Sequence, residues 1–223
     1  MHVPDGFLPA AVLAGGYVVT AGVTALSLRQ INKEEDPRAA IPKAALLTAA
    51  FFIASAIRFP APPPATSLHL ILCGLMGVVL GWYAYPAILV GLILQFLVFG
   101  HGGVTTLGVN AVIMGVPALL AHAVFSTARK KGIGKARLQG TAFVAGFIGV
   151  ALAVLAFYSL MVNAIPDALD GSTEQAAITF LSLWHLPVGL VEGVITALLV
   201  GYLKRVRPEI LGFEPDVKWS SAD

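Results

Sequence analysis

Residues 59–128 form the sequence FPAPPPATSLHLILCGLMGVVLGWYAYPAILVGLILQFLVFGHGGVTTLGVNAVIMGVPALLAHAVFSTA, which contains no aspartate, glutamate, lysine or arginine. A helix that crosses a bilayer needs about 20 consecutive apolar residues. The uncharged stretch, bounded by Arg58 and Arg129, is therefore long enough for about three such helices. We infer that the chain is a polytopic helical membrane protein.

The composition of the whole chain supports this fold class. Among 223 residues, 57% are hydrophobic and only 12% are charged, whereas a soluble domain is about 45–50% apolar and about 25% charged. Such a chain cannot cover a water-facing surface, which excludes an ordinary soluble enzyme, a disordered protein and a nucleic-acid-binding protein. The single cysteine, Cys73, excludes an internal disulfide and a cysteine-cluster metal site.

Hydropathy predicts seven membrane spans in an all-α fold. They cover residues 8–28, 41–59, 66–82, 86–100, 109–128, 138–162 and 178–203. The second span has the weakest support because only 14 residues lie between Lys43 and Arg58, and an apolar run of that length is ambiguous. No basic residue precedes the first span, so we expect it to be retained rather than cleaved as a signal peptide.

The distribution of basic residues orients these spans. With the N-terminus outside, the inner segments are 29–43, 83–85, 129–137 and 204–223, and they hold thirteen of the fourteen Lys and Arg residues. Cytoplasmic segments are rich in Lys and Arg, and omitting the second span would place later basic clusters on opposite sides. We therefore expect one transmembrane domain over residues 1–223, with an outer N-terminal strand 1–8 and a cytoplasmic tail 204–223.

The first two residues, Met1 and His2, can form a metal chelate. A free amine on Met1, the amide nitrogen of His2 and Nδ1 of the His2 ring would close two fused rings around one ion. The amine, with a pKa of about 8, and the amide must each lose a proton. A nearly planar field of nitrogen donors favours Ni²⁺ or Cu²⁺. Co²⁺ can also bind, whereas Zn²⁺ prefers a tetrahedron.

A second histidine on the same side of the membrane would fill the fourth planar position, and His69 meets that need. It lies within the expected first turn of the third span, where Thr66 or Ser67 could cap the helix or orient the imidazole. The alternative is that His2 stands in second place by chance and that His69 is an ordinary hydrogen-bonded residue.

Four stretches of the chain, in the right order and over nearly its whole length, resemble the CbiM/NikM family. This family comprises the substrate-binding membrane subunits of cobalt and nickel energy-coupling-factor transporters. The stretches are MHVPDGFL at 1–8, ATSLH at 65–69, QFLVFGHGG at 95–103 extending to Gly108-Val109-Asn110, and HLP at 185–187 with Glu192-Gly193. The first stretch is the most specific, because its two leading residues are metal ligands in that family.

The resemblance implies a seven-helix fold with an outer N-terminus and a Ni²⁺ or Co²⁺ ion held by Met1, His2 and His69. Four further residues, which would surround and position these ligands, are Asp5, Ser67, His101 and Asn110. Many members of the family have an aspartate at the position of His101. This difference leaves the choice between the two metals open.

The resemblance also implies partners. The chain has no Gly-x-x-x-x-Gly-Lys-Ser/Thr motif, so we expect it to be no enzyme and to hydrolyse no ATP itself. A membrane coupling subunit, a pair of cytoplasmic ATPases and often a small accessory membrane subunit would drive uptake across the inner membrane of a prokaryote. In the cobalt case the metal would serve cobalamin biosynthesis. The metal ion is then cargo, and no catalytic cofactor is expected.

Ionisable residues inside membrane spans are functional candidates, and Glu192 is the one acidic residue inside a predicted span. It stands seven residues after His185 on the same helix face, where it could make a polar contact between helices or relay protons. Two alternative functions are a stand-alone secondary metal transporter, with Glu192 as proton carrier, and an intramembrane metalloenzyme. The absence of a His-Glu-x-x-His motif weighs against the enzyme. Gln95 and His122 suggest no specific role.

Overall fold

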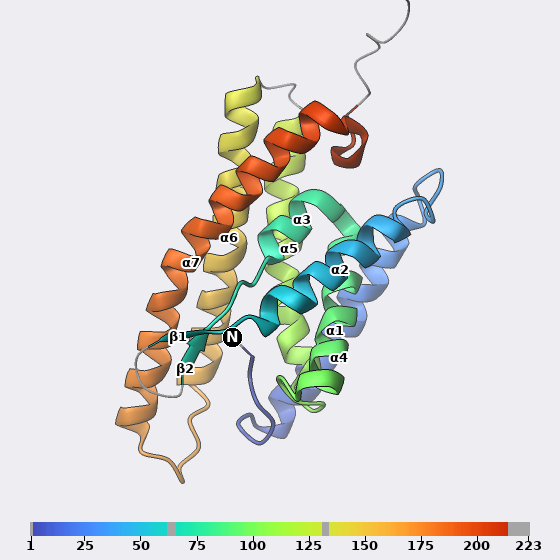
Figure 1. The fold of residues 1–223 in the computed structure, drawn as a ribbon. Helices are drawn as coiled ribbons and strands as arrows, with labels where there is room; N and C mark the ends of the chain where they lie inside the picture. The colour runs from blue at the N-terminus through green and yellow to red at the C-terminus, as the bar shows by residue number, and fades with distance from the viewer. Residues whose placement is uncertain (1, 62–65, 131–133, 214–223) are drawn as a thin grey trace, which may run out of the picture.

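The fold is described by a computed structural model that covers residues 2–61, 66–130 and 134–213. Within these residues lie seven α-helices, two short strands and two 3₁₀ turns (Figure 1). The helices are α1 (Ala10–Ile31), α2 (Ile41–Ala56), α3 (Cys73–Leu80), α4 (Ala84–Phe99), α5 (Leu107–Lys130), α6 (Lys135–Val162) and α7 (Gly171–Val206). The strands are β1 (Phe59–Ala61) and β2 (Thr66–Leu68), and the 3₁₀ turns are η1 (Gly81–Tyr83) and η2 (Pro208–Leu211).

Five helical segments of the described chain are long and apolar enough to cross a bilayer. They are α1, the continuous run Cys73–Phe99, α5, α6 and α7, whereas α2 is apolar but has only 16 residues. The prediction of a mostly helical, multi-pass membrane protein is thereby confirmed.

The third predicted span, residues 66–82, differs most from the structure. Residues 66–68 form β2, which pairs antiparallel with β1, and α3 begins only at Cys73. His69 therefore lies ahead of the helix rather than in its first turn, and the N-cap position of α3 is Leu72 rather than residue 66 or 67. The all-α description needs the same correction, because this two-stranded ribbon precedes α3.

The connection predicted at residues 83–85 is helical in the structure. The turn η1 links α3 to α4, and Gly81 has a φ of 61°, a left-handed value that favours glycine. Figure 1 shows the ribbon turning at this point, so α3 and α4 run in different directions without a loop between them.

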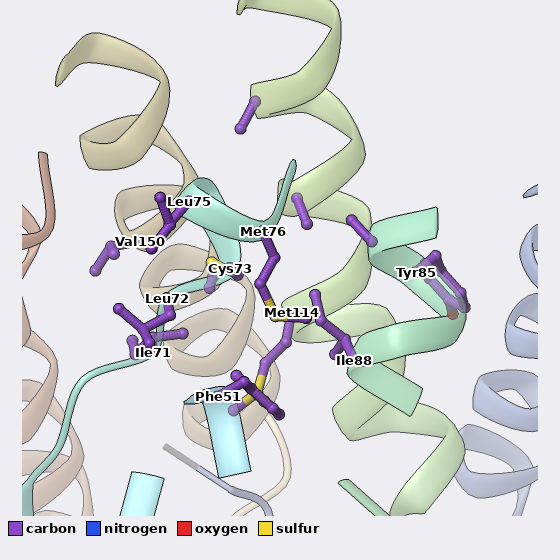
Figure 2. Packing of buried hydrophobic residues seen from close by; sticks show 14 of the residues in the cluster. Phe51, Ile71, Leu72, Cys73, Leu75, Met76, Tyr85, Ile88, Met114 and Val150 are labelled. Atoms are coloured by element: carbon purple, nitrogen blue, oxygen red, sulfur yellow. The ribbon is translucent and has the colours of Figure 1, made fainter. Parts of the chain in front are cut away.

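Small residues allow α3 to lie between α5 and α6. A Cβ atom on Gly74 would stand 2.5 Å from the carbonyl oxygen of Gly146 in α6, and a Cβ on Gly77 would overlap the carbonyl of Ala118 in α5. Backbones can approach this closely only where side chains are absent. All eight residues of α3 are buried, and Figure 2 shows Met76 beside Met114 at the centre of the apolar packing.

The helix α7 begins at Gly171, ahead of its predicted start at 178, because Asp170 caps it. The Asp170 carboxylate accepts a hydrogen bond from the main-chain N–H of Ser172 at 3.2 Å. At its other end α7 continues to Val206, so the predicted tail from 204 begins inside the helix. Residues 214–223 lie outside the described residues.

Many of the described basic residues gather at one end of the bundle. Figure 1 shows the end of α5, the start of α6 and the end of α7 together at one end, and the connection 163–170 at the other. The basic residues in these helix ends are Arg129, Lys130, Lys135, Arg137, Lys204, Arg205 and Arg207, whereas the connection 163–170 carries Asp167 and Asp170. The N-terminal segment lies toward the acidic end.

Candidate functional site

The N-terminal segment folds back onto the bundle and is fixed there through Val3, whose exposed fraction is 0%. The main-chain N–H of Val3 donates to Oδ1 of Asn110 at 2.9 Å, and Nδ2 of Asn110 donates to the Val3 carbonyl at 3.1 Å. The Thr106 hydroxyl donates to the same carbonyl at 2.8 Å. One side chain of α5 and one residue just before it therefore satisfy both main-chain groups of Val3.

A second anchor holds the segment at Asp5. Its carboxylate accepts hydrogen bonds from the main-chain N–H groups of Thr105 at 3.1 Å and Thr106 at 3.3 Å, and from the Thr105 hydroxyl. The hydroxyl bond in particular lowers the pKa of Asp5. A side chain on Gly103 would overlap this carboxylate. Glycine is therefore required for the segment to lie where it does.

These anchors place the His2 ring beside α4. Its Nε2 lies 2.7 Å from Oε1 of Gln95, a side chain with an exposed fraction of 0%. An amide oxygen only accepts hydrogen bonds, so Nε2 carries the proton and Nδ1 keeps the lone pair. Nδ1 is the nitrogen that the predicted chelate requires.

Two imidazoles stack on the His2 ring, and a third meets one of these two. The ring of His2 stacks on the ring of His69, with 5.5 Å between centroids, and on the ring of His101, with 5.7 Å between centroids. The ring of His185, from α7, meets the ring of His69 edge-on at 6.2 Å. Nδ1 of His69 lies 2.9 Å from the Leu70 carbonyl, to which it donates, so the lone pair is on Nε2.

Three of the six buried side-chain polar atoms that lack a hydrogen-bond partner in the described structure belong to these rings and to Gln95. They are Nε2 of Gln95, Nδ1 of His101 and Nε2 of His185. Such atoms are rare in folded proteins, and a bound ion or water commonly explains them. These three nitrogen atoms are therefore available to contact a bound ligand.

The described residues contain no group of three or more His, Cys, Asp or Glu side chains arranged to hold a metal ion. The predicted chelate does not need such a group, because two of its donors are the N-terminal amine and a main-chain amide. The amine belongs to Met1, which lies outside the described residues.

The structure brings together most of the residues predicted to form the site. His2, His69 and His101 lie ring to ring, and the other predicted residues near them, Asp5 and Asn110, anchor the N-terminal segment. Ser67 lies in β2 opposite Pro60, ahead of the start of α3 at Cys73. The sequence analysis missed Thr105 and Thr106, and it gave Gln95 no role. A pair of threonines just before a helix was the available signal for an anchor.

The buried imidazoles make stability depend on pH. Burial lowers the pKa of His2 well below the ordinary value, and it lowers the pKa of the more exposed His101 in the same direction. In the unfolded chain both rings gain protons as the pH falls through about 6.5, whereas the folded His2 ring resists protonation. We expect the metal-free protein to lose up to about 1.4 kcal/mol per pH unit below that pH through His2, and His101 to add less because solvent screens it. Thermal unfolding in detergent between pH 7.5 and 5.5 measures this loss, and a constant midpoint would contradict it.

Comparisons with known proteins agree with these features. Residues 2–210 match the family model of CbiM, described as the cobalt uptake substrate-specific transmembrane region. The chain is 30% identical over 220 residues to the cobalt transport protein CbiM of Sorangium cellulosum, covering 95% of this chain and 94% of that protein. It is 31% identical over 223 residues to the fused nickel transport protein NikMN of Rhodobacter capsulatus, covering 95% of this chain and 64% of that protein.

A solved structure shows the same fold. The crystal structure of a truncated transition metal transporter superposes with a TM-score of 0.77 at 26% sequence identity. The match covers 92% of this chain and 99% of that chain. The arrangement of helices described above is therefore also found in a protein named for transition metal transport.

Proposed function

Because the chain belongs to the CbiM family of cobalt-uptake transmembrane proteins, we propose that it captures Ni²⁺ or Co²⁺ for an ATP-driven energy-coupling-factor transporter. One observation carries the proposal. The N-terminal segment is anchored to the bundle through the buried Val3, and the His2 ring stacks on the rings of His69 and His101.

The proposed ligands are four nitrogens: the Met1 amine, the His2 amide, Nδ1 of His2 and Nε2 of His69. The hydrogen bond to Gln95 supports this assignment, because it leaves the lone pair of His2 on Nδ1. The Asn110 bond to Val3 and the Thr105 bond to Asp5 hold the main chain that follows His2 against the bundle. Four nitrogen donors near one plane suit Ni²⁺, and they can also hold Co²⁺.

We also propose that all seven helices lie in the inner membrane of a prokaryote, with the N-terminus outside and the C-terminus in the cytoplasm. The gathering of basic residues at one end of the bundle supports this orientation. The metal site then faces outward, where the ion is captured. The basic end faces inward, where a membrane coupling subunit, a pair of ATPases and a small accessory subunit would act.

Metal uptake by cells tests the ATP-driven function. We expect Ni²⁺ or Co²⁺ accumulation when the chain is produced with a coupling subunit and active ATPases, because the chain itself lacks a phosphate-binding motif. Replacing the ATPases with forms whose phosphate-binding lysine is mutated should reduce uptake to the level of cells without the chain. Uptake that persists would instead indicate a stand-alone secondary transporter. Competition between Ni²⁺ and Co²⁺ on the purified protein identifies the preferred cargo.

A further inference from the structure

The segment that carries His69 is non-helical chain inside a helical bundle. Residues 69–72 connect β2 to α3, His69 and Ile71 are buried, and Leu72 has a φ of 53°, the one described non-glycine residue with a positive φ. Main-chain N–H groups outside helices and strands need polar partners, and this need is strongest in a membrane protein. The partners of this segment therefore determine its position.

One side chain of α7 supplies those partners. Glu192 has an exposed fraction of 1%, and its two carboxyl oxygens each accept one main-chain hydrogen bond. One oxygen accepts from the N–H of Ile71, and the other accepts from the N–H of Leu72 at 2.8 Å. These donors follow His69 by two and three residues.

We propose that Glu192 is a positioning residue for the metal site, which holds the segment 69–72 so that the His69 imidazole stays beside His2. The proposal rests on the proposed function. A buried carboxyl group is costly in a membrane protein and is retained where it satisfies specific donors.

The competing conformation is a longer helix. Residues 66–72 are apolar enough that hydropathy predicts them to be helical, and the N–H groups of Ile71 and Leu72 would then bond to preceding main-chain carbonyls. Such a helix would carry His69 away from its present place. The carboxyl of Glu192 favours the observed conformation, because it satisfies the same two N–H groups without a helix.

The rest of the segment agrees with a fixed geometry. Immediately after Leu72, α3 is locked against α6 by the contact of Gly74 with Gly146. From the same helix as Glu192, His185 places its ring against the ring of His69. The helix α7 thus touches the segment at two points on one face, and Glu192 provides the hydrogen bonds.

Titration of purified protein with Ni²⁺ alone, against a competing chelator, tests this role. Five samples with the native N-terminus are compared: wild type, Glu192→Ala, Glu192→Gln, His69→Ala and the control Thr196→Val. Thr196 is also buried on α7, but its hydroxyl donates to the Glu192 main-chain carbonyl and not to the segment. Thermal unfolding of each metal-free sample reports on the fold separately.

We expect Glu192→Ala to weaken Ni²⁺ binding by about 10–100-fold, the usual effect of losing a residue that orients a metal ligand. Glu192→Gln should be intermediate, because the amide oxygen accepts one of the two hydrogen bonds while the NH₂ group faces the other donor. The absorption spectrum of bound Ni²⁺ in Glu192→Ala should approach that of His69→Ala. Thr196→Val should bind as wild type does.

Wild-type affinity in Glu192→Gln and in any folded Glu192→Ala sample would overturn the proposal, even with a lower unfolding midpoint. If Glu192→Ala does not fold, Glu192→Gln decides alone: weaker binding by a folded protein supports the role and unchanged binding overturns it. The His69→Ala sample keeps the two hypotheses apart. Unchanged binding in His69→Ala would contradict the proposed ligand set itself, whatever Glu192 does.

Discussion

An uncleaved N-terminal extension is expected to abolish high-affinity Ni²⁺ binding. It converts the Met1 amine into an amide and moves His2 away from second place, which removes one donor and breaks the fused chelate. We expect a loss of at least about 100-fold, the upper limit seen when only an outer residue of a metal site is lost. The measurement is competition binding on one preparation with a cleavable N-terminal tag, before and after proteolysis restores the native start.

The matched control carries the same tag at the C-terminus. There the tag follows residues at the opposite end of the chain and leaves the Met1 amine free. Equal affinity of the N-terminally extended and native proteins would exclude the amine as a ligand. The proposed chelate would then have to be abandoned.

Replacing either of the two proposed imidazole ligands has the second largest expected effect. His2→Ala removes Nδ1 together with the hydrogen bond to Gln95, and His69→Ala removes the fourth donor. Each should lower Ni²⁺ affinity by at least about 100-fold, since a direct ligand matters more than the residues around it. Each should cost only about 0.5–3 kcal/mol of stability, as most single substitutions do. Competition binding measures affinity, and circular dichroism with thermal unfolding measures the fold.

His122→Ala provides the control for these two substitutions. The His122 ring lies on α5 against Trp82, with 5.9 Å between centroids, in another part of the bundle. We expect Ni²⁺ affinity to be unchanged in this variant. If His2→Ala or His69→Ala bound Ni²⁺ as tightly as His122→Ala does, the corresponding imidazole would not be a ligand.

The fold was predictable where charge and hydropathy act together. The predicted spans 109–128 and 138–162 lie within α5 and α6. The basic segment 129–137 bounds the end of the first apolar run and the start of the second, so both limits were visible in the sequence. The start of α3 was not predictable in this way. The apolar residues 66–72 suit a buried helix and a buried extended chain equally well, and the choice depends on β1 and on Glu192, which are distant in sequence.

The candidate site was likewise predictable only in part. The proximity of His2 and His69 was predicted from the N-terminal pattern and from topology, and the ring stacking agrees with it. The roles of Gln95, Thr106 and Glu192 depend on which buried main-chain or ring atoms they face. Composition and spacing carry no information on such pairings, so only the three-dimensional arrangement reveals them.

The shortness of α2 has a consequence for the surrounding lipid. Sixteen residues at about 1.5 Å each span only about 24 Å, whereas the hydrocarbon core of a bilayer is about 30 Å thick. As one of the proposed spans, α2 creates a hydrophobic mismatch that nearby acyl chains relieve by compressing. The membrane should therefore be locally thinner beside α2 than beside α6 or α7.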